Sequence, residues 1–256
     1  MKRAFPILAI LTALLLAYAF HEAIWVAPME RTMGDVQRIF YYHVPSAWTA
    51  FLLFFVNLIA SVTYLIRRNA KADAIAVVSA EVGVVFCTVV LVTGPIWARP
   101  VWGIWWTWDI RLTTTLVLWL IYVSYLVLRR FSDSSQTPKL AAVLAIFGAL
   151  DVPLVYFSIW FFRTQHPQPV IGGGGSIDPR MLHVLLLNWL AFSCFALLVC
   201  WGRYRLELLE RAVEEAQSLE SLVGDNRLGV KRPGERSIPL KTKLPLDKNP
   251  SRTGTQ

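Results

Sequence analysis

Charged residues are scarce in this 256-residue chain, at 16%, whereas hydrophobic residues make up 55% and the mean hydropathy is +0.49. That balance excludes an ordinary soluble domain, in which about a quarter of the residues are charged. Cysteine is also scarce. The three cysteines, Cys87, Cys194 and Cys200, all lie within apolar runs, so neither a disulfide framework nor a cysteine-ligated zinc site is expected.

Several catalytic signatures are missing as well. The sequence has no H-E-x-x-H, no C-x-x-C-H, no glycine loop followed by lysine and no dinucleotide fingerprint. These absences exclude a covalently attached c-type haem and a nucleotide-driven motor within this chain. We therefore expect a protein that is not an enzyme, that has no nucleic-acid partner and whose energy source, if it uses one, lies in another subunit.

Six apolar runs are each long enough to cross about 30 Å of hydrocarbon as a helix. They cover residues 5–26, 47–66, 74–97, 112–128, 140–162 and 181–201. The sequence thus predicts an all-α fold, a polytopic membrane bundle of six transmembrane helices within residues 1–202. The first run follows Lys2 and Arg3 as a secretory signal would, but its apolar character continues to residue 26, which favours a retained span.

Basic residues indicate the orientation of the bundle. Lys2, Arg3, Arg67, Arg68, Lys71, Arg129, Arg130 and Lys139 all fall on one side, which we expect to be cytoplasmic, together with both termini. The opposite loops carry arginine but no lysine. Arginine alone suits bidentate recognition of carboxylates, although chance in small numbers explains the pattern equally well.

The chain changes character after the last apolar run. Residues 203–223 predict a cytoplasmic amphipathic helix, because leucine and valine recur on one face among glutamate and arginine. Residues 224–256 are rich in proline, lysine and arginine, so we expect a disordered basic tail that could touch anionic lipid or a partner.

Four of the eleven tryptophans lie in one short outer segment, Trp102, Trp105, Trp106 and Trp108, which ends at Asp109. Read as a helix, positions 102, 105, 106 and 109 share one face, which would form a flat aromatic surface tipped by a carboxylate. Arg99 and Arg111 flank this segment. Such a surface suits a planar apolar ligand that carries carboxylates, whereas the alternative is an ordinary interfacial tryptophan belt.

Two histidines accompany the tryptophans on the outer side. His43 precedes the second apolar run, and His166 follows the fifth, next to Pro167. A lone interfacial histidine is usually a hydrogen-bonding residue, but two neutral imidazoles beside an aromatic surface favour an axially ligated porphyrin. His21 and His183 are the competing candidates, and we expect them to pack or hydrogen-bond within the bundle.

Three other features have structural interpretations. Glu81 and Asp151 are ionisable groups at membrane depth, for which a helix-to-helix hydrogen bond is favoured over a functional role. The run 172–176, Gly-Gly-Gly-Gly-Ser, resembles no phosphate-binding turn and predicts a flexible connector.

Three motifs of this chain resemble the CcmC family of cytochrome c maturation proteins, within the haem-handling membrane proteins that share a tryptophan-rich "WWD" segment. The motifs are Gly34-Asp35 through His43-Val44-Pro45, Trp102-Gly103 through Arg111-Leu112-Thr113, and Arg163-Thr164-Gln165-His166. The resemblance covers about residues 25–185. It implies a protein of the bacterial inner membrane that handles haem.

The resemblance also implies a site and a set of partners. Haem b would bind the WWD segment at the outer face, with His43 and His166 as axial ligands, and would pass to the haem chaperone CcmE. The other family partners are CcmA and CcmB, which are subunits of an ATP-binding cassette complex, and the small protein CcmD.

From these features we expect haem to lie edge-on at the outer leaflet. Trp102, Trp105 and Trp106 would contact its face, with Trp108 and Asp109 in the same segment, and Asp109 would orient the segment or pair with an arginine. Arg38, Arg99 and Arg111 would neutralise the propionates. Whether the protein moves haem across the bilayer or only presents it stays open.

Three alternatives remain at this point. The nearest is a short CcsA-like component of cytochrome c synthesis, although CcsA and CcmF relatives generally have more spans. A membrane cytochrome b would usually place histidine pairs inside the spans. A solute permease would require polar groups near the midplane, for which Glu81 and Asp151 give slight support.

Overall fold

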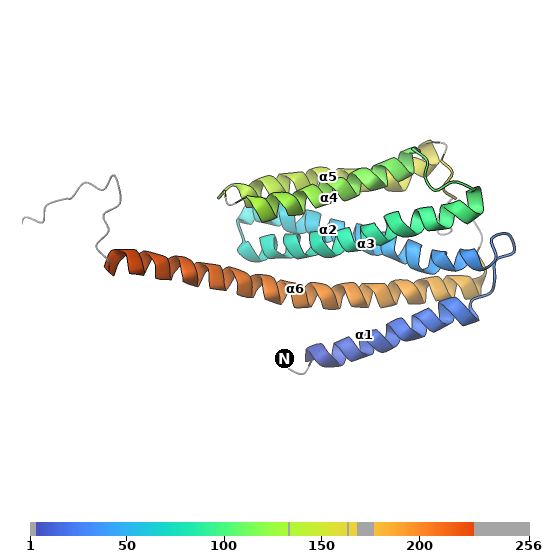
Figure 1. Cartoon of the computed structure of the whole chain (residues 1–256), viewed down its shortest axis with the longest axis horizontal. Helices are drawn as coiled ribbons and strands as arrows, with labels where there is room; N and C mark the ends of the chain where they lie inside the picture. Colours follow the sequence, from blue (N-terminus) through green and yellow to red (C-terminus); the bar gives the residue numbers. More distant parts are fainter. Residues whose placement is uncertain (1–3, 133, 163, 168–176, 228–256) are drawn as a thin grey trace, which may run out of the picture. The chain divides into compact units, whose positions relative to one another are not determined.

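A computed structural model describes residues 4–132, 134–162, 164–167 and 177–227. Six long helices follow one another along the chain: α1 (Ala4–His21), α2 (Phe40–Arg67), α3 (Ala70–Trp102), α4 (Ile110–Phe131), α5 (Thr137–Phe161) and α6 (Pro179–Arg227). A π-helical turn, η1 (Glu22–Val26), extends α1, and a 3-10 turn, η2 (Asp35–Ile39), leads into α2. Figure 1 shows these helices, and the described residues contain no strand.

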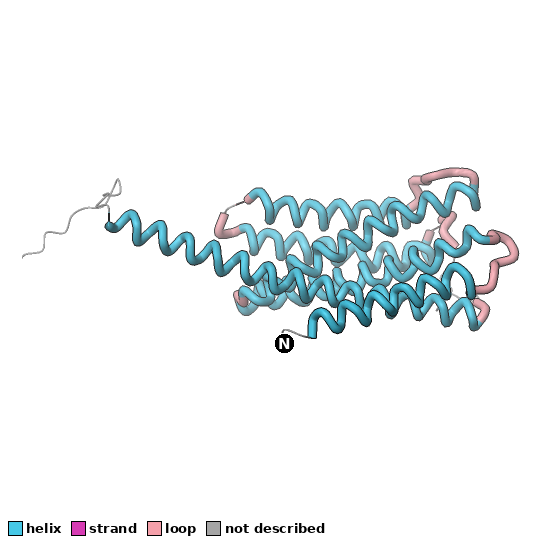
Figure 2. The backbone as a smooth tube through the Cα atoms, turned by 60° about the horizontal axis from the view of Figure 1, so that its bottom comes forward, coloured by secondary structure: helices cyan, strands magenta, loops and turns pink. Residues whose placement is uncertain are grey.

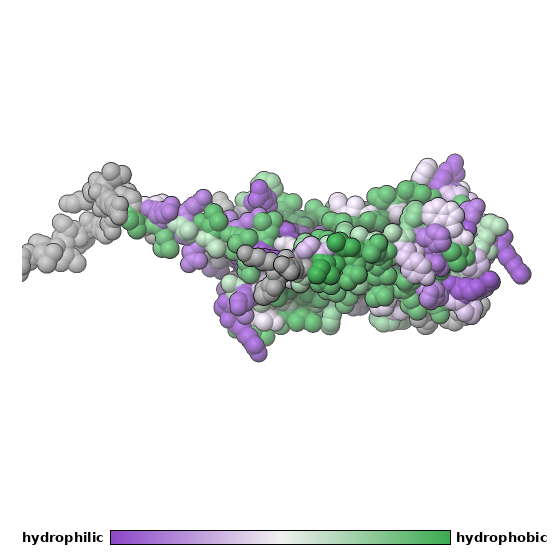
Figure 3. All heavy atoms as spheres, turned by 90° about the horizontal axis from the view of Figure 1, so that it is seen from below, coloured by the Kyte–Doolittle hydropathy of each residue, from purple (hydrophilic) through white to green (hydrophobic). Residues whose placement is uncertain are grey.

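Each of the six helices contains a stretch long and apolar enough to cross a membrane, and the predicted all-α membrane bundle is thereby confirmed. Many side chains on the outward faces of the helices are apolar and exposed, as contact with lipid requires. Phe55, Ile59 and Val85, for example, are more than half exposed although they are apolar. Figure 3 shows apolar side chains along the flank of the bundle, and Figure 2 shows that the loops gather at its two ends. A bilayer would cover such a flank.

The chain divides into two compact units, residues 1–211 and 212–256, each of which is considered by itself. In the first unit, α2 packs against α3 and α5, and α4 packs against the same two helices. Rings stack at the centre of this four-helix core, where Phe54 and Tyr122 lie 3.9 Å apart with nearly parallel planes. Trp189 on α6 contacts Trp48 on α2, and Trp201 on α6 contacts Phe5 on α1.

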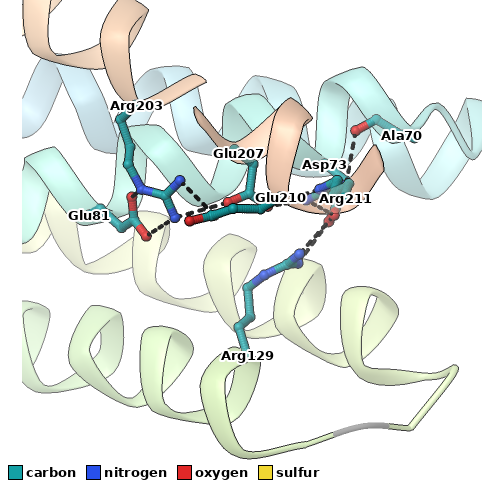
Figure 4. Close-up of polar contacts among 8 residues, drawn as sticks. All are labelled: Ala70, Asp73, Glu81, Arg129, Arg203, Glu207, Glu210 and Arg211. Carbon is teal, nitrogen blue, oxygen red and sulfur yellow. Dashed lines mark hydrogen bonds and ion pairs between the residues drawn. The ribbon is translucent and has the colours of Figure 1, made fainter. Parts of the chain in front are cut away.

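Ion pairs join α3, α4 and α6 at the end of the bundle opposite to the tryptophan-rich segment (Figure 4). Asp73 accepts two hydrogen bonds of 2.7 Å from Arg129 and one of 2.9 Å from Arg211. Arg203 pairs with Glu81 at 2.8 Å. Glu207 links the two halves of the network, since it pairs with both Arg203 and Arg211. Glu81 on α3 is therefore paired with Arg203 on α6, which agrees with the expected contact between helices.

Asp151, the other ionisable residue of the spans, is buried in α5, and its Oδ2 atom has no hydrogen-bond partner among the described residues. The predicted amphipathic segment 203–223 is helical, and it belongs to α6, which continues to Arg227. Helix therefore extends past residue 224, where the disordered tail was expected to begin. The rest of the predicted tail, residues 228–256, and the glycine run 172–176 lie outside the described residues.

Candidate functional site

The tryptophan-rich segment is not a helix, and the expectation of one helical face is wrong. Helix α3 ends at Trp102, where Gly103 adopts a left-handed conformation (φ +79°) and donates its N–H to the carbonyl of Arg99. Helix α4 begins after Asp109, whose Oδ1 atom accepts the N–H of Leu112 at 2.9 Å. Glycine as a helix C-cap and aspartate as an N-cap are recognisable signals, so the break was readable from the sequence.

The four indoles consequently face different surroundings. Trp102 and Trp106 line a large pocket, whereas Trp105 lines a smaller pocket of about 210 Å³ that also borders Trp102 and Trp106. Trp108 lines neither pocket and is 76% exposed. Two of the four predicted tryptophans thus reach the main pocket.

The main pocket encloses about 830 Å³ of space between the side chains, with the open solvent at its mouth included. Its walls are apolar and come from α2, α3, α4 and α5, together with the tryptophan-rich segment. The ionisable groups on its lining are His43, Cys87, Arg111 and His166. The structure therefore brings together both predicted histidines, which lie far apart in the sequence.

His43 lies in the first turn of α2, because that helix begins at Phe40 rather than at residue 47. Its Nδ1 atom lies 2.8 Å from Oγ1 of Thr93 on α3. The carbonyl of Val89 lies 2.7 Å from the same hydroxyl and can accept its single proton, so we assign Nδ1 of His43 as the donor and Oγ1 of Thr93 as the acceptor. Nδ1 therefore carries the ring proton, and Nε2 has a free lone pair.

His166 lies in the loop that follows α5, and its ring is fixed in the same tautomer. Nδ1 lies 2.9 Å from the carbonyl oxygen of Pro167, which can only accept a hydrogen bond, so Nε2 again has the lone pair. Burial and then the nearby charge of Arg111 lower the pKa of His166 to about 4, so the ring is neutral at pH 7. The ring centroids of His43 and His166 are 6.4 Å apart.

Of the three predicted arginines, Arg111 alone lines the main pocket. Its Nη1 atom is buried and has no hydrogen-bond partner among the described residues. Arg99 donates to the carbonyl of Gly103 and so caps the end of α3. Arg38 donates to the carbonyls of Ala23 and Ala27 and pairs with Asp35, so it fastens η1 to η2 instead of facing the pocket.

Asp109 does not line the main pocket, and it pairs with no arginine among the described residues. Its Oδ2 atom instead accepts the hydroxyl of Thr164 at 3.0 Å and the N–H of Gln165 at 3.4 Å. These bonds attach the histidine loop to the start of α4. The competing histidines lie elsewhere, since His21 and His183 are both exposed and neither lines the main pocket or the smaller one.

The structure adds residues to which the sequence analysis gave no role at the site. Thr93 is hydrogen-bonded to Nδ1 of His43, Thr164 joins the histidine loop to Asp109, and Cys87 lines the main pocket. A threonine within an apolar run usually bonds to its own helix, as Thr93 also does, so its spacing gave no signal of a contact with another helix. Arg163, part of the third motif, lies outside the described residues.

The sequence model of the family described as "Heme exporter protein C", CcmC, matches residues 1–219. The chain belongs to the CcmC family. Heme exporter protein C of Bradyrhizobium diazoefficiens is 36% identical over 222 residues, which cover 86% of this chain and 84% of that protein. The proteins of the same name from Haemophilus influenzae and Escherichia coli K12 are 34% and 33% identical, and they match 80% and 73% of this chain and 85% and 76% of their own lengths. The three motifs of this CcmC-family chain that carry the resemblance all lie within the matched region.

Proposed function

We propose that this CcmC-family protein takes part in haem export for cytochrome c maturation by binding haem b in the main pocket, with His43 and His166 as axial ligands, and passing it to the haem chaperone CcmE. The observation that carries the proposal is the pair of imidazoles on one apolar pocket, each with a proton on Nδ1 and a lone pair on Nε2. The protein is a binding and transfer protein, not an enzyme, and haem is its cargo.

The separation of the two rings supports this assignment. A metal atom midway between centroids 6.4 Å apart would lie about 3.2 Å from each. With both Nε2 atoms turned onto the line between the centroids, each about 1.2 Å from its own centroid, about 2 Å would remain for each metal–nitrogen bond, the usual length for histidine ligands. The described residues contain no group of three or more metal-ligating side chains, so the pair suits a metal that brings its own equatorial ligands, as a porphyrin does.

The rest of the pocket supports a porphyrin over a smaller metal complex. Trp102 and Trp106 provide apolar aromatic surface, and the helices add aliphatic walls. Arg111 supplies a buried cation with an unused donor, which suits a propionate. The placements of Arg38 and Arg99 give no support to a role in binding propionates. Trp105 and Trp108 do not line the main pocket. We assign them to contacts with the edge of the bound haem or with the incoming chaperone.

The setting of the protein follows from the same reasoning. We place it in the bacterial inner membrane with the haem pocket outward and both termini in the cytoplasm, because Lys71 and Lys139, the lysines of the described residues, begin α3 and α5 at the end of the bundle opposite to the pocket. Its partners there are CcmA, CcmB and CcmD, with lipid around the bundle. The names of the relatives, which are heme exporter proteins, support this assignment.

An optical spectrum tests the proposal. The detergent-purified protein should give a six-coordinate low-spin spectrum of haem b when oxidised and when reduced. His43→Ala and His166→Ala should each convert that spectrum to a five-coordinate form or abolish binding, whereas the control His183→Ala should not change it. A wild-type protein that binds no added haem would refute the proposal, and a loss confined to His183→Ala would move the second ligand.

A further inference from the structure

The two histidines of the main pocket are held in different ways. His43 belongs to a helix, is 8% exposed and is braced by Thr93 on a neighbouring helix. His166 belongs to a loop whose described part, residues 164–167, contains no helix. The position of His166 therefore depends on the few hydrogen bonds that its loop makes.

Those bonds converge on Asp109 through Thr164. The Thr164 hydroxyl donates to Oδ2 of Asp109 at 3.0 Å and accepts the backbone N–H of His166 at 3.0 Å. The N–H of Gln165 donates to the same carboxylate oxygen at 3.4 Å. The carboxylate of Asp109 thus orients two successive backbone amides, that of Gln165 directly and that of His166 through the Thr164 hydroxyl. We call this set of bonds the Asp109–Thr164 contact.

Asp109 is itself held firmly, because its other oxygen caps α4 and Thr107 approaches its Oδ2 atom at 3.4 Å. Helix α4 also carries Arg111 into the pocket. The start of α4 is therefore a common support for Arg111 and for the loop of His166. Hydrogen bonds to a charged carboxylate are stronger than those between neutral groups, so the contact can hold a loop that has no helix of its own.

We propose that the Asp109–Thr164 contact is a latch that positions His166 on the cargo, and that His166 is the axial ligand that dissociates first during transfer while His43 stays bound. This inference rests on the proposed function, in which both rings ligate haem. The exchange breaks one iron–nitrogen bond and leaves one coordination position for a donor atom of the acceptor. No electron is transferred and the oxidation state of iron does not change.

The latch is tested first without haem, by hydrogen exchange at the backbone amides of Gln165 and His166. Thr164→Val keeps the shape of the side chain and removes the hydroxyl, so exchange at these two amides should become at least about tenfold faster. Thr164→Ser keeps the hydroxyl and should match the wild type. The amide of Gly103, which donates to Arg99, is the internal control. Unchanged exchange in Thr164→Val would overturn the latch.

The ligand role is tested with haem bound, by following its transfer to excess apomyoglobin. Thr164→Val should release haem about tenfold faster and show a high-spin five-coordinate fraction, whereas Thr164→Ser should behave as the wild type. Asp109→Asn retains a residue that caps helices well but replaces an acceptor oxygen by an amino group, so it should resemble Thr164→Val. If Thr93→Val gave a larger five-coordinate fraction than Thr164→Val, His43 would be the weaker ligand and the proposal would be wrong.

The two measurements also separate this inference from the proposed function. Amide exchange is measured on the haem-free protein, so its result decides the latch whether or not haem binds. A wild-type protein that fails to bind haem would refute the proposed function and with it the ligand exchange. Faster amide exchange together with an unchanged rate of haem release would show that the contact is structural only and would overturn the positioning role.

Discussion

His43 and His166 lie with their ring centroids 6.4 Å apart, and Nδ1 of each is hydrogen-bonded to an oxygen of the protein. The two oxygens differ in kind. Thr93 offers a side-chain hydroxyl from a neighbouring helix, whereas Pro167 offers the carbonyl of the adjacent residue in the loop. The ring of His43 therefore depends on the packing of α2 against α3, and that of His166 depends on the shape of its loop.

The first prediction concerns Thr93. Thr93→Val removes the acceptor for His43 Nδ1, so the ring loses the bond that fixes its tautomer and should bind haem about tenfold more weakly. A haem titration followed by absorbance measures the change. Thr63→Val is the matched control, because Thr63 makes the same bond to its own helix at the other end of α2. Equal affinities for the two variants would contradict the role of Thr93.

The second prediction concerns Arg111 and the carboxylates of haem. Wild-type protein should bind haem more tightly than its dimethyl ester, by roughly ten- to a hundredfold, because the ester cannot pair with a guanidinium. Arg111→Gln should bind the two compounds equally, and Arg99→Gln should keep the wild-type preference, since Arg99 caps α3. A preference that survives Arg111→Gln would place the propionates elsewhere.

The arrangement of the helices was largely predictable from the sequence, and the reason is physical. A bilayer demands about twenty apolar residues for each crossing, and that demand leaves a clear signal for each span. The ends of the helices were less predictable. Phe40 to His43 belong to α2, where Phe40 and Tyr41 are buried and Tyr42 is partly buried against other segments of the bundle, which is a tertiary effect outside the reach of a hydropathy pattern.

The candidate site was predictable in its residue types and less so in its contacts. The sequence predicted that His43 and His166 share one site, and in the structure both line the main pocket. The choice among Arg38, Arg99 and Arg111 was not readable, because it depends on which carbonyls lie nearby once the chain has folded. Arg38 and Arg99 satisfy carbonyls at helix ends, and Arg111 has no such carbonyl within reach among the described residues.

The third prediction concerns the ion pairs around Asp73. Asp73→Ala would leave Arg129 and Arg211 buried or half-buried without their shared partner, and we expect it to lower the free energy of unfolding by about 3 kcal/mol. Equilibrium unfolding in mixed detergent micelles measures the difference. Asp35→Ala removes an exposed ion pair with Arg38 and should cost no more than about 1 kcal/mol. Equal losses of unfolding free energy in Asp73→Ala and Asp35→Ala would show that the buried ion pairs contribute little to stability.

The last prediction concerns the packing of the four-helix core at Gly83. A Cβ atom at this position would lie 2.7 Å from Cε1 of Phe54, a distance that real side chains do not tolerate. The ring of Phe54 cannot move aside, because it is fully buried and stacked on Tyr122 at 3.9 Å. Gly83→Ala should therefore destabilise the protein by about 1–3 kcal/mol, as overpacking of a core does.

A second glycine provides the control for this measurement. A Cβ atom at Gly202 would meet only the ring of Phe5, at 3.5 Å, so Gly202→Ala should leave the stability unchanged or raise it slightly through better helix propensity. Adding Phe54→Leu to Gly83→Ala removes the clashing ring atoms, so this change should cost less in the Gly83→Ala background than in the wild type. If the two substitutions were simply additive in unfolding experiments, the loss would not arise from contact with Phe54.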